Sequence, residues 1–303
     1  MRKLLLPALA CLLFAPPAHA QVVELYHPAA PLAAYEVATI KPADPATASA
    51  PAFVGSAGGP VRFRAGVARG DTTIKNYILN AYGASPASQA QIVGGPAWLA
   101  SDAYTINGKI PDDLRAAMDK MTPEDRANQT RQMQQSLLAD RFHLKAHIET
   151  RTLPLYELAP VKSGIKFKPV PAPAPFVPGE PIGPPKPGAP LRPGMMMIGV
   201  NGSTRTINAG ATNMPGLIAM LRNQSEIGGK PILDKTGFTD HFDIVNLRWA
   251  GLSTAAPADN GAPDTDAPSL FTALEETLGL KLTPAKGPVE VLVIDSIDRP
   301  TEN

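Results

Sequence analysis

A proline-rich stretch between residues 163 and 194 constrains the fold of this chain more than any other feature. From Pro169 to Pro193 a proline stands at every second or third position or closer. Proline lacks a backbone N–H and fixes φ, so such a stretch is expected neither to join a sheet nor to form a helix. It behaves as an extended, semi-rigid tether. We therefore predict a linker at residues 163–196 that joins a first domain, residues 21–162, to a second domain, residues 197–303.

The first twenty residues have the pattern of a secretory signal peptide. Met1-Arg2-Lys3 is followed by an apolar run over residues 4–15 and by the small-residue site Ala18-His19-Ala20. This run is too short to span a bilayer stably. We predict cleavage after Ala20 and a periplasmic or secreted protein. Cleavage removes Arg2 and Lys3, so Lys+Arg falls from 28 to 26 against Asp+Glu 27, and the net charge becomes −1. No basic excess remains to attract nucleic acid.

Cys11 is the only cysteine of the sequence, and it lies inside the predicted signal peptide. The mature chain would therefore contain no disulfide. Leu9-Ala10-Cys11 also partly resembles a lipoprotein site, which leaves lipidation of Cys11 as an alternative. Against that alternative, Ala8 stands where leucine is expected and the apolar run continues past the cysteine. No second apolar run approaches the ~20 residues of a transmembrane helix, so we expect a soluble mature protein.

Apolar periodicity predicts strands and helices in the first half. Strands are expected at residues 35–42, 61–65, 142–148 and 155–161, and after a glycine-proline turn in residues 91–106. Asp71-Thr72 can cap a helix that is ended by Gly83 and buries Ile74, Tyr77, Ile78 and Ala81. A surface helix is expected near Pro111. Thr122 can cap a stronger helix, with Met133, Leu137 and Leu138 as its core face.

The same order of signals returns beyond the linker. Residues 204–209 correspond to 61–65, residues 214–221 to the first helix, and residues 232–245 to 92–106. Residues 269–294 then predict a helix capped by Ser269 and ended by Gly279, a strand at 280–282, a proline-flanked turn, and a strand at 289–294. We therefore predict an α+β fold of two related small domains, each a mixed sheet with helices on one face. Residues 289–294 should form an inner strand of the second sheet, covered by Leu270, Leu274 and Leu278.

Several strings of the sequence resemble a family of exported, soil-associated bacterial proteins of unknown function. In the first half they are residues 35–42 (YEVATIKP), 94–99 (GGPAWL) with Ser101-Asp102, and 137–142 (LLADRF). In the second half they are residues 234–238 (DKTGF), 271–274 (FTAL), 278–282 (LGLKL) and 287–295 (GPVEVLVID). The resemblance implies a role in the cell envelope and no established activity. Some relatives carry this region after an antirepressor-type membrane metallopeptidase of the kind that senses β-lactams. Each half is also similar, in element order alone, to the βαβ modules of secretins and TonB-dependent receptors.

Two motifs invite a chemical interpretation. His143 and His147 have the i, i+4 spacing of a helical zinc site. The surrounding alternation predicts a strand instead, where residues four apart lie ~13 Å from each other. Asp234-Lys235-Thr236-Gly237 matches the phosphorylated aspartate string of cation-pumping ATPases, but no other part of such an enzyme is present. A turn with Gly237 at positive φ is the better interpretation.

A third motif imitates the penicillin-recognising serine enzymes. Lys235-Thr236-Gly237 can be combined with Ser163-Gly164-Ile165-Lys166 and with Ser101-Asp102. The order is wrong, because the Ser-x-x-Lys string should come first and should open a helix. Ala103 also replaces the asparagine that those enzymes require.

The candidate binding residues are Trp98, Asp102, Asp234 and Lys235. Trp98 could be exposed at a loop tip or packed over the core, and Asp102 could be a turn or capping carboxylate. We identify no catalytic residue, no metal ligand and no cofactor. The favoured function is a non-enzymatic cell-envelope module that binds or scaffolds a protein, a peptide or a glycan. The alternative is an envelope hydrolase or sensor of the β-lactam-recognising type.

Overall fold

The computed structural model describes residues 21–28, 32–43, 67–173, 191–251 and 267–300. Three predicted features lie outside these residues: the signal peptide at 1–20, the strand at 61–65, and the centre of the proline-rich stretch at 174–190. Within the described part, no helix has both the length and the apolar character needed to cross a membrane.

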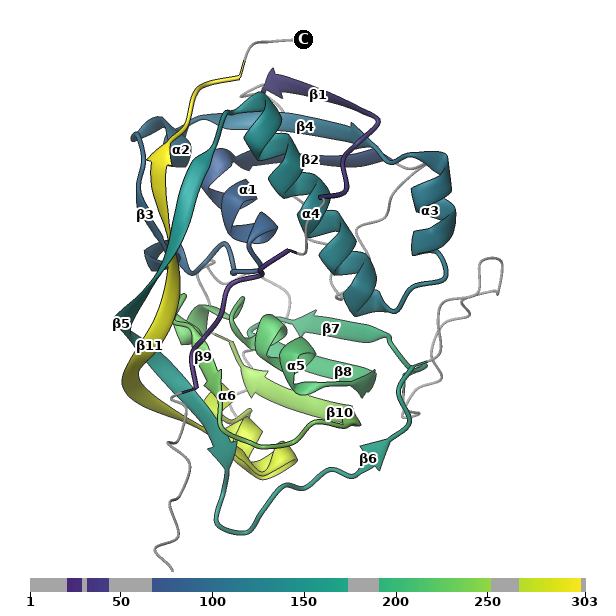
Figure 1. Cartoon of the computed structure of the whole chain (residues 1–303). Coiled ribbons are helices and arrows are strands. Elements are labelled where there is room, and N and C mark those ends of the chain that lie inside the picture. The colour runs from purple at the N-terminus through teal and green to yellow at the C-terminus, as the bar shows by residue number, and fades with distance from the viewer. Residues whose placement is uncertain (1–20, 29–31, 44–66, 174–190, 252–266, 301–303) are drawn as a thin grey trace, which may run out of the picture.

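The described residues form a mixed α/β structure with three sheets, arranged as two lobes beside a long two-stranded ribbon (Figure 1). The first lobe contains the antiparallel sheet β1-β4-β2. Its strands are β1 (Val37–Pro42), β2 (Val67–Thr73) and β4 (Ala103–Lys109). Its helices are α1 (Ile74–Ala81), α2 (Trp98–Ser101), α3 (Asp112–Met118) and α4 (Pro123–Arg141), with a 3-10 turn η1 (Gln89–Gln91).

The caps of the first-lobe helices follow the predicted pattern closely. The Thr122 hydroxyl accepts the Asp125 N–H (3.2 Å) and begins α4. In α1 the cap is Thr73 rather than Asp71-Thr72, because the Thr73 hydroxyl accepts the Asn76 N–H (3.3 Å). The predicted apolar faces are confirmed as buried, namely Ile74, Tyr77, Ile78 and Ala81 of α1 and Met133, Leu137 and Leu138 of α4.

The second lobe contains the antiparallel sheet β6-β10-β8-β7. Its strands are β6 (Pro169–Val170), β7 (Met196–Asn201), β8 (Thr204–Thr212) and β10 (His241–Ala250). Its helices are α5 (Met214–Leu221), the 3-10 turn η2 (Ser225–Ile227), and α6 (Leu270–Ala273), which continues as a π-helical turn η3 (Leu274–Leu278). Ser269 caps α6 through the Thr272 N–H (3.1 Å), and Gly279 ends the π-helical turn with φ +67°, as predicted.

The third sheet has the order β3-β11-β5-β9 and belongs to both lobes. Its central strands are β5 (Lys145–Pro160) and β11 (Leu280–Ser296), which pair antiparallel over their whole length. They run side by side along one flank of both lobes (Figure 1). The short strands β3 (Ile92–Gly94) and β9 (Ile232–Asp234) add in parallel, β3 to β11 in the first lobe and β9 to β5 in the second.

Each ribbon strand contributes to both hydrophobic cores. Tyr156 and Leu158 of β5 join the second core, while Leu292 and Ile294 of β11 join the first. The expected cover of residues 289–294 by Leu270, Leu274 and Leu278 is therefore wrong. Those leucines pack in the second core with the beginning of β11, Leu280 and Leu282, because the antiparallel ribbon carries β11 out of that lobe before it reaches Val289.

The proline-flanked turn expected between 282 and 289 is also wrong, because β11 continues through it. The Tyr156 N–H donates to the Pro231 carbonyl (2.9 Å), and the Glu290 N–H donates to the Val23 carbonyl (2.9 Å). Both N–H groups therefore point out of the ribbon. Antiparallel pairs alternate between those that exchange hydrogen bonds and those that do not. In this register Pro154, Pro284 and Pro288 all fall in non-exchanging pairs. An N–H group at each of these positions would point out of the ribbon. Proline therefore removes no hydrogen bond between β5 and β11.

The proline-rich stretch is better ordered at its beginning than expected. Phe167 stacks on Phe242 with ring centroids 4.1 Å apart, and the Lys166 N–H donates to the Leu278 carbonyl (3.0 Å). Residues 169–170 then pair with β10 as β6, a short edge strand, so this part does join a sheet. Proline is tolerated there because an edge strand needs hydrogen bonds on one side only.

The element order is similar in the two lobes, although the duplication and the domain boundaries stay predictions. In the first lobe the order is β2, α1, η1, β3, α2 and β4, and in the second it is β8, α5, η2, β9 and β10, with no described counterpart of α2. Because β5 and β11 each pass from one core to the other, neither predicted domain, 21–162 or 197–303, contains the whole of its own core.

Candidate binding surfaces

Trp98 and Asp102 lie together at the start of β4, where the end of the chain crosses them. The Arg299 guanidinium lies 5.2 Å from the centre of the Trp98 ring and donates two hydrogen bonds to Asp102 Oδ2 (3.0 and 3.2 Å). Hydrogen bonds from Ser101 and Arg299 lower the pKa of the Asp102 carboxyl. Trp98 also packs, partly buried, against the first core. In this arrangement both residues hold the C-terminal segment on α2.

Asp234 and Lys235 form part of a tight turn in the other lobe. Asp234 Oδ1 accepts hydrogen bonds from the Thr236 N–H (2.8 Å) and hydroxyl (2.7 Å), and Gly237 adopts φ +66°. These contacts confirm the turn interpretation of Asp-Lys-Thr-Gly. Lys235 is exposed, and its backbone N–H donates to Leu158 (2.8 Å). The structure therefore does not unite the four predicted binding residues in one site.

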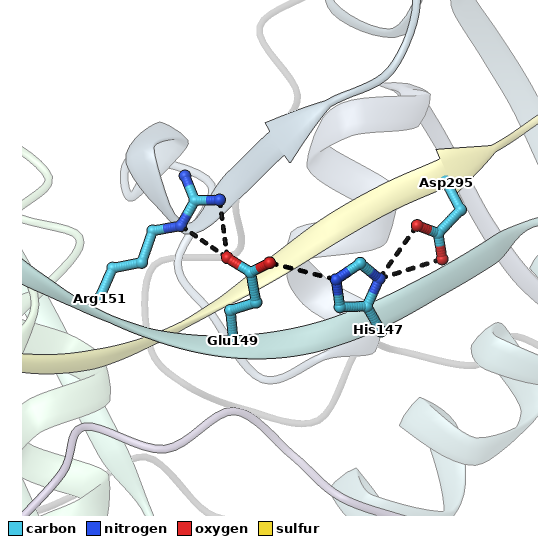
Figure 2. A network of polar contacts seen from close by, with 4 residues as sticks. All are labelled: His147, Glu149, Arg151 and Asp295. Atoms are coloured by element: carbon cyan, nitrogen blue, oxygen red, sulfur yellow. Dashed lines mark hydrogen bonds and ion pairs between the residues drawn. The ribbon is translucent and has the colours of Figure 1, made fainter.

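A chain of polar contacts that the sequence analysis did not anticipate lies on the outer face of the ribbon. His147 Nδ1 lies 3.0 Å from Asp295 Oδ1, and its Nε2 lies 3.3 Å from Glu149 Oε1. Arg151 donates two hydrogen bonds to Glu149 Oε2 (2.7 and 2.9 Å) (Figure 2). His147, Glu149 and Arg151 share one face of β5, and their alternating spacing could have indicated such a row. Asp295 joins them from β11.

The charges in this network shift one another. Hydrogen bonds to the Asp295 carboxylate and then to the Glu149 carboxylate raise the pKa of His147. Hydrogen bonds that Glu149 accepts from Arg151 and then from His147 lower the pKa of Glu149. All four side chains are 42 to 50% exposed, so water screens these interactions. The contact of His147 with Asp295 holds β11 against β5.

The helical zinc site suggested by His143 and His147 is replaced by two different environments. His143 has φ +49° just before β5 begins and lies 3.1 Å from Asp298 Oδ2. His147 points to Asp295 and Glu149 as described. Across the described ranges, no group of three or more His, Cys, Asp or Glu side chains is placed to hold a metal ion.

The residues that imitate a penicillin-recognising enzyme lie apart. Ser163 lies in an exposed turn after β5 and opens no helix, and Lys166 Nζ donates to the Glu276 carbonyl (2.8 Å). Ser101 belongs to α2 of the first lobe, where its hydroxyl donates to Asp102 (2.8 Å). Within the described residues no hydrogen bond joins either serine to Lys166 or Lys235.

Strand β7 is the least protected sheet edge in the described part of the chain. Its sequence, MMIGVN, contains neither charge nor proline, and Met197 and Val200 are 39% and 64% exposed. By contrast, β1 carries Lys41 and Pro42, β2 contains charges of both signs, and β3, β6 and β9 have three residues or fewer. The free stretches of β5 and β11 are also charged. Natural proteins usually block an open edge with such charges, prolines or short lengths.

The register shows which main-chain groups of β7 are available. The Gly210 N–H donates to the Met195 carbonyl (2.9 Å), so the next pair, Met196 with Ala209, exchanges no hydrogen bonds. By alternation the same holds for Ile198 and Val200. Their N–H and C=O groups therefore point away from β8, on the side where the described structure places no further strand.

Comparison with known proteins identifies a family and no function. A family model described as a protein of unknown function (DUF3738) matches residues 75–297, which include the ribbon, the second lobe and the first lobe without β1 and β2. No curated protein and no solved structure matches the chain.

Proposed function

The chain belongs to the DUF3738 family of proteins of unknown function, and we propose that it is an exported, non-enzymatic module that binds a protein or peptide partner in the cell envelope. The single observation that carries this proposal is β7, a six-residue edge strand without charge or proline. An extended partner segment would add to this edge as a further antiparallel or parallel strand.

Strand addition draws its affinity from main-chain hydrogen bonds and its specificity from alternating side chains. The outward N–H and C=O groups of Met196, Ile198 and Val200 supply the first. Met197 and Val200 supply exposed apolar surface on opposite faces of the strand. A partner segment rich in β-branched residues would match both, because such side chains favour strands and cover apolar neighbours.

The export part of the proposal rests on the signal-peptide pattern at residues 1–20. The envelope role rests on the resemblance of the sequence to a family of exported, soil-associated bacterial proteins. Two features support a binding role over catalysis. The Asp102 and Asp234 carboxylates are engaged with Arg299 and with a turn, and the described residues contain no hydrogen-bonded pair of nucleophile and base in a pocket. The alternative role, a hydrolase or sensor of the β-lactam type, has no comparable feature in its favour.

A crosslinking experiment with matched variants tests the proposal. A photoreactive residue placed at Met197 in cells that express the full chain is expected to capture an envelope partner. Val200→Pro removes one outward N–H without breaking a bond to β8, and it should abolish capture. Val200→Thr keeps the N–H and the β-branched shape, and it should preserve capture. Equal capture by the two variants would exclude strand addition at β7.

A further inference from the structure

Two arginines from different lobes meet at the same glycine. Arg131 lies on α4 of the first lobe, and Arg222 follows α5 of the second. Arg222 Nη2 donates to the Gly83 carbonyl (3.2 Å), and a Cβ added to Gly83 would lie 3.6 Å from Arg131 Nε. Gly83 itself has φ +73°, which favours glycine at this close approach. The junction of the lobes therefore brings both guanidinium groups to Gly83, and the charge of one acts on the other.

Most of the donor capacity of these guanidinium groups is unused. Each group has five N–H donors, and the structure records one side-chain hydrogen bond for each, from Arg222 to Gly83 and from Arg131 Nη1 to Asn128 Oδ1 (2.6 Å). Arg222 Nε is fully buried and has no partner. A buried donor without an acceptor is costly, so the protein groups of the described residues leave the Arg222 guanidinium incompletely satisfied.

Neither charge of the pair is matched by an ion-paired carboxylate among the described residues. Arg115, Arg151 and Arg299 each form an ion pair with a carboxylate. In the part of the chain that the structure describes, neither Arg131 nor Arg222 does so. Arg131 instead lies over the Tyr26 ring, 5.6 Å from its centre.

Burial lowers the pKa of both guanidinium groups, and the charge of Arg131 lowers the pKa of Arg222 further. The Tyr26 side chain and the Glu124 carboxylate act on Arg131 in the opposite direction without forming an ion pair. Glu124 is already approached by Asn213 across the junction (3.4 Å). Two like charges that are largely withdrawn from water and share no counter-ion are unfavourable unless an anion joins them.

We propose that the lobe junction is a binding site for a doubly charged oxyanion, a phosphate or sulfate group, held between Arg131 and Arg222. The planar guanidinium fork matches such oxyanions through paired hydrogen bonds. Two forks favour a dianion over a monocarboxylate because both positive charges are then neutralised. A ligand held by one residue from each lobe would also fix the lobes relative to each other. This site is independent of the β7 edge.

Titration of inorganic phosphate into the full chain at about pH 8, where phosphate is a dianion, tests the proposal. Calorimetry should show one site, competed by sulfate and not by acetate at equal ionic strength. Arg131→Gln and Arg222→Gln should each weaken binding about tenfold or more. Arg192→Gln is the matched control, since Arg192 is an exposed arginine outside the junction, and it should leave binding unchanged. Phosphate should also raise the melting temperature of the wild type and not that of Arg222→Gln.

The outcomes separate a ligand site from a merely structural pair. Absence of phosphate binding up to about 10 mM, or equal weakening by Arg192→Gln, overturns the proposal. A purely structural Arg222 would make Arg222→Gln less stable in the absence of phosphate and would give the wild type no phosphate-dependent stabilisation. If Arg222→Gln does not fold, Arg222→Lys keeps the charge without the fork, and weaker phosphate binding by that variant supports the site while unchanged binding contradicts it.

Discussion

The backbone of Gly229 packs directly on the carbonyl oxygen of Ala87, and this contact joins the second lobe to the first. A Cβ added to Gly229 would overlap the Ala87 carbonyl. A second contact nearby is the hydrogen bond from Ser85 Oγ to Asn223 Oδ1 (2.6 Å). The lobes therefore meet through closely fitted main chain as well as through the shared ribbon.

Gly229→Ala should destabilise the protein more than the neighbouring Gly228→Ala. Both glycines have positive φ (+70° and +61°), so both substitutions carry a backbone cost of about 1 kcal/mol. Only Gly229 has a neighbour in the way, because nothing lies within 4 Å of a Cβ at Gly228. We expect a total loss of about 2 to 4 kcal/mol for Gly229→Ala in urea unfolding. Equal losses for the two variants would show that the lobes do not pack as described.

Proline should be tolerated at Val200 and harmful at Met197. The Val200 N–H points away from β8, whereas the Met197 N–H belongs to an exchanging pair with Asn208. Met197→Pro should therefore cost about 2 kcal/mol of unfolding free energy, and Val200→Pro less than about 1 kcal/mol. Thermal and urea unfolding of both variants measure this difference. If Val200→Pro lowered the unfolding free energy more than Met197→Pro, the N–H groups of β7 that bond to β8 would be those of the alternate residues.

His147→Gln should reduce stability in mild acid and not in mild alkali. The pKa of His147 is raised above 6.5 in the folded state. The protonated imidazole therefore stabilises the fold below about pH 6.5, and this contribution is lost as the pH rises through the raised pKa. Urea unfolding of the wild type and the variant at about pH 5.5 and pH 8.5 measures the effect.

A direct titration of His147 gives the independent check. NMR of the imidazole should report a pKa above 6.5, and Asp295→Asn should bring it down, because the Asp295 hydrogen bond is the largest cause of the shift. The pKa of Glu149 is lowered in the folded state. Its carboxylate therefore stabilises the fold above about pH 4.5, and this contribution is lost as the pH falls through the lowered pKa. An unchanged pKa in Asp295→Asn would mean that the imidazole does not face Asp295 in solution.

Fluorescent penicillin should not label the folded protein. The Lys166 ammonium donates to a main-chain carbonyl, and the Ser101 hydroxyl donates to Asp102. Among the described residues neither Ser163 nor Ser101 is hydrogen-bonded to the lysine that a penicillin-recognising enzyme would use to activate it. Gel fluorescence after incubation, with a penicillin-binding enzyme as positive control, measures labelling. Labelling that disappears in Ser163→Ala or Ser101→Ala would revive the β-lactam alternative.

The two predicted halves should not fold separately. A fragment of residues 21–162 lacks Leu292 and Ile294 from the first core, and a fragment of residues 163–303 lacks Tyr156 and Leu158 from the second. Each fragment alone should give no cooperative unfolding transition, whereas a mixture should regain the near-ultraviolet circular dichroism of the intact chain. A cooperative transition in either single fragment would contradict the shared-core arrangement.

Local pattern was enough to predict α1, α4, α5 and α6 and the caps of α4 and α6, although α1 is capped by Thr73 and the short helix α2 was not predicted. Thr122, Ser269 and Gly279 have the predicted roles because capping depends on groups within one helical turn. The apolar faces of α1 and α4 follow from the 3.6-residue period in the same way. The turn at Asp234 was predictable because the side chain bonds to its own neighbours.

The arrangement of the strands was not predictable from local pattern. Pro154, Pro284 and Pro288 indicated strand ends. Each of them instead lies in a β5–β11 residue pair that exchanges no hydrogen bonds. Which pairs exchange hydrogen bonds depends on the register between the two strands, and local pattern does not determine that register. The row of His147, Glu149 and Arg151 shows alternation, but its partner Asp295 comes from a strand far along the chain. The meeting of Arg131 with Arg222 likewise arises only when the lobes come together.

The shared ribbon determines when the chain can fold. Leu292 near the C-terminus pairs with Ile148 and completes the first core, so that core stays unfinished until β11 is available. Contacts between residues so distant in sequence slow folding, because a large loop must close before they form. During synthesis the chain would therefore remain largely unfolded until its last strand is released. Such a delay would suit the export that we propose, in which the polypeptide passes through a translocation channel as an extended thread.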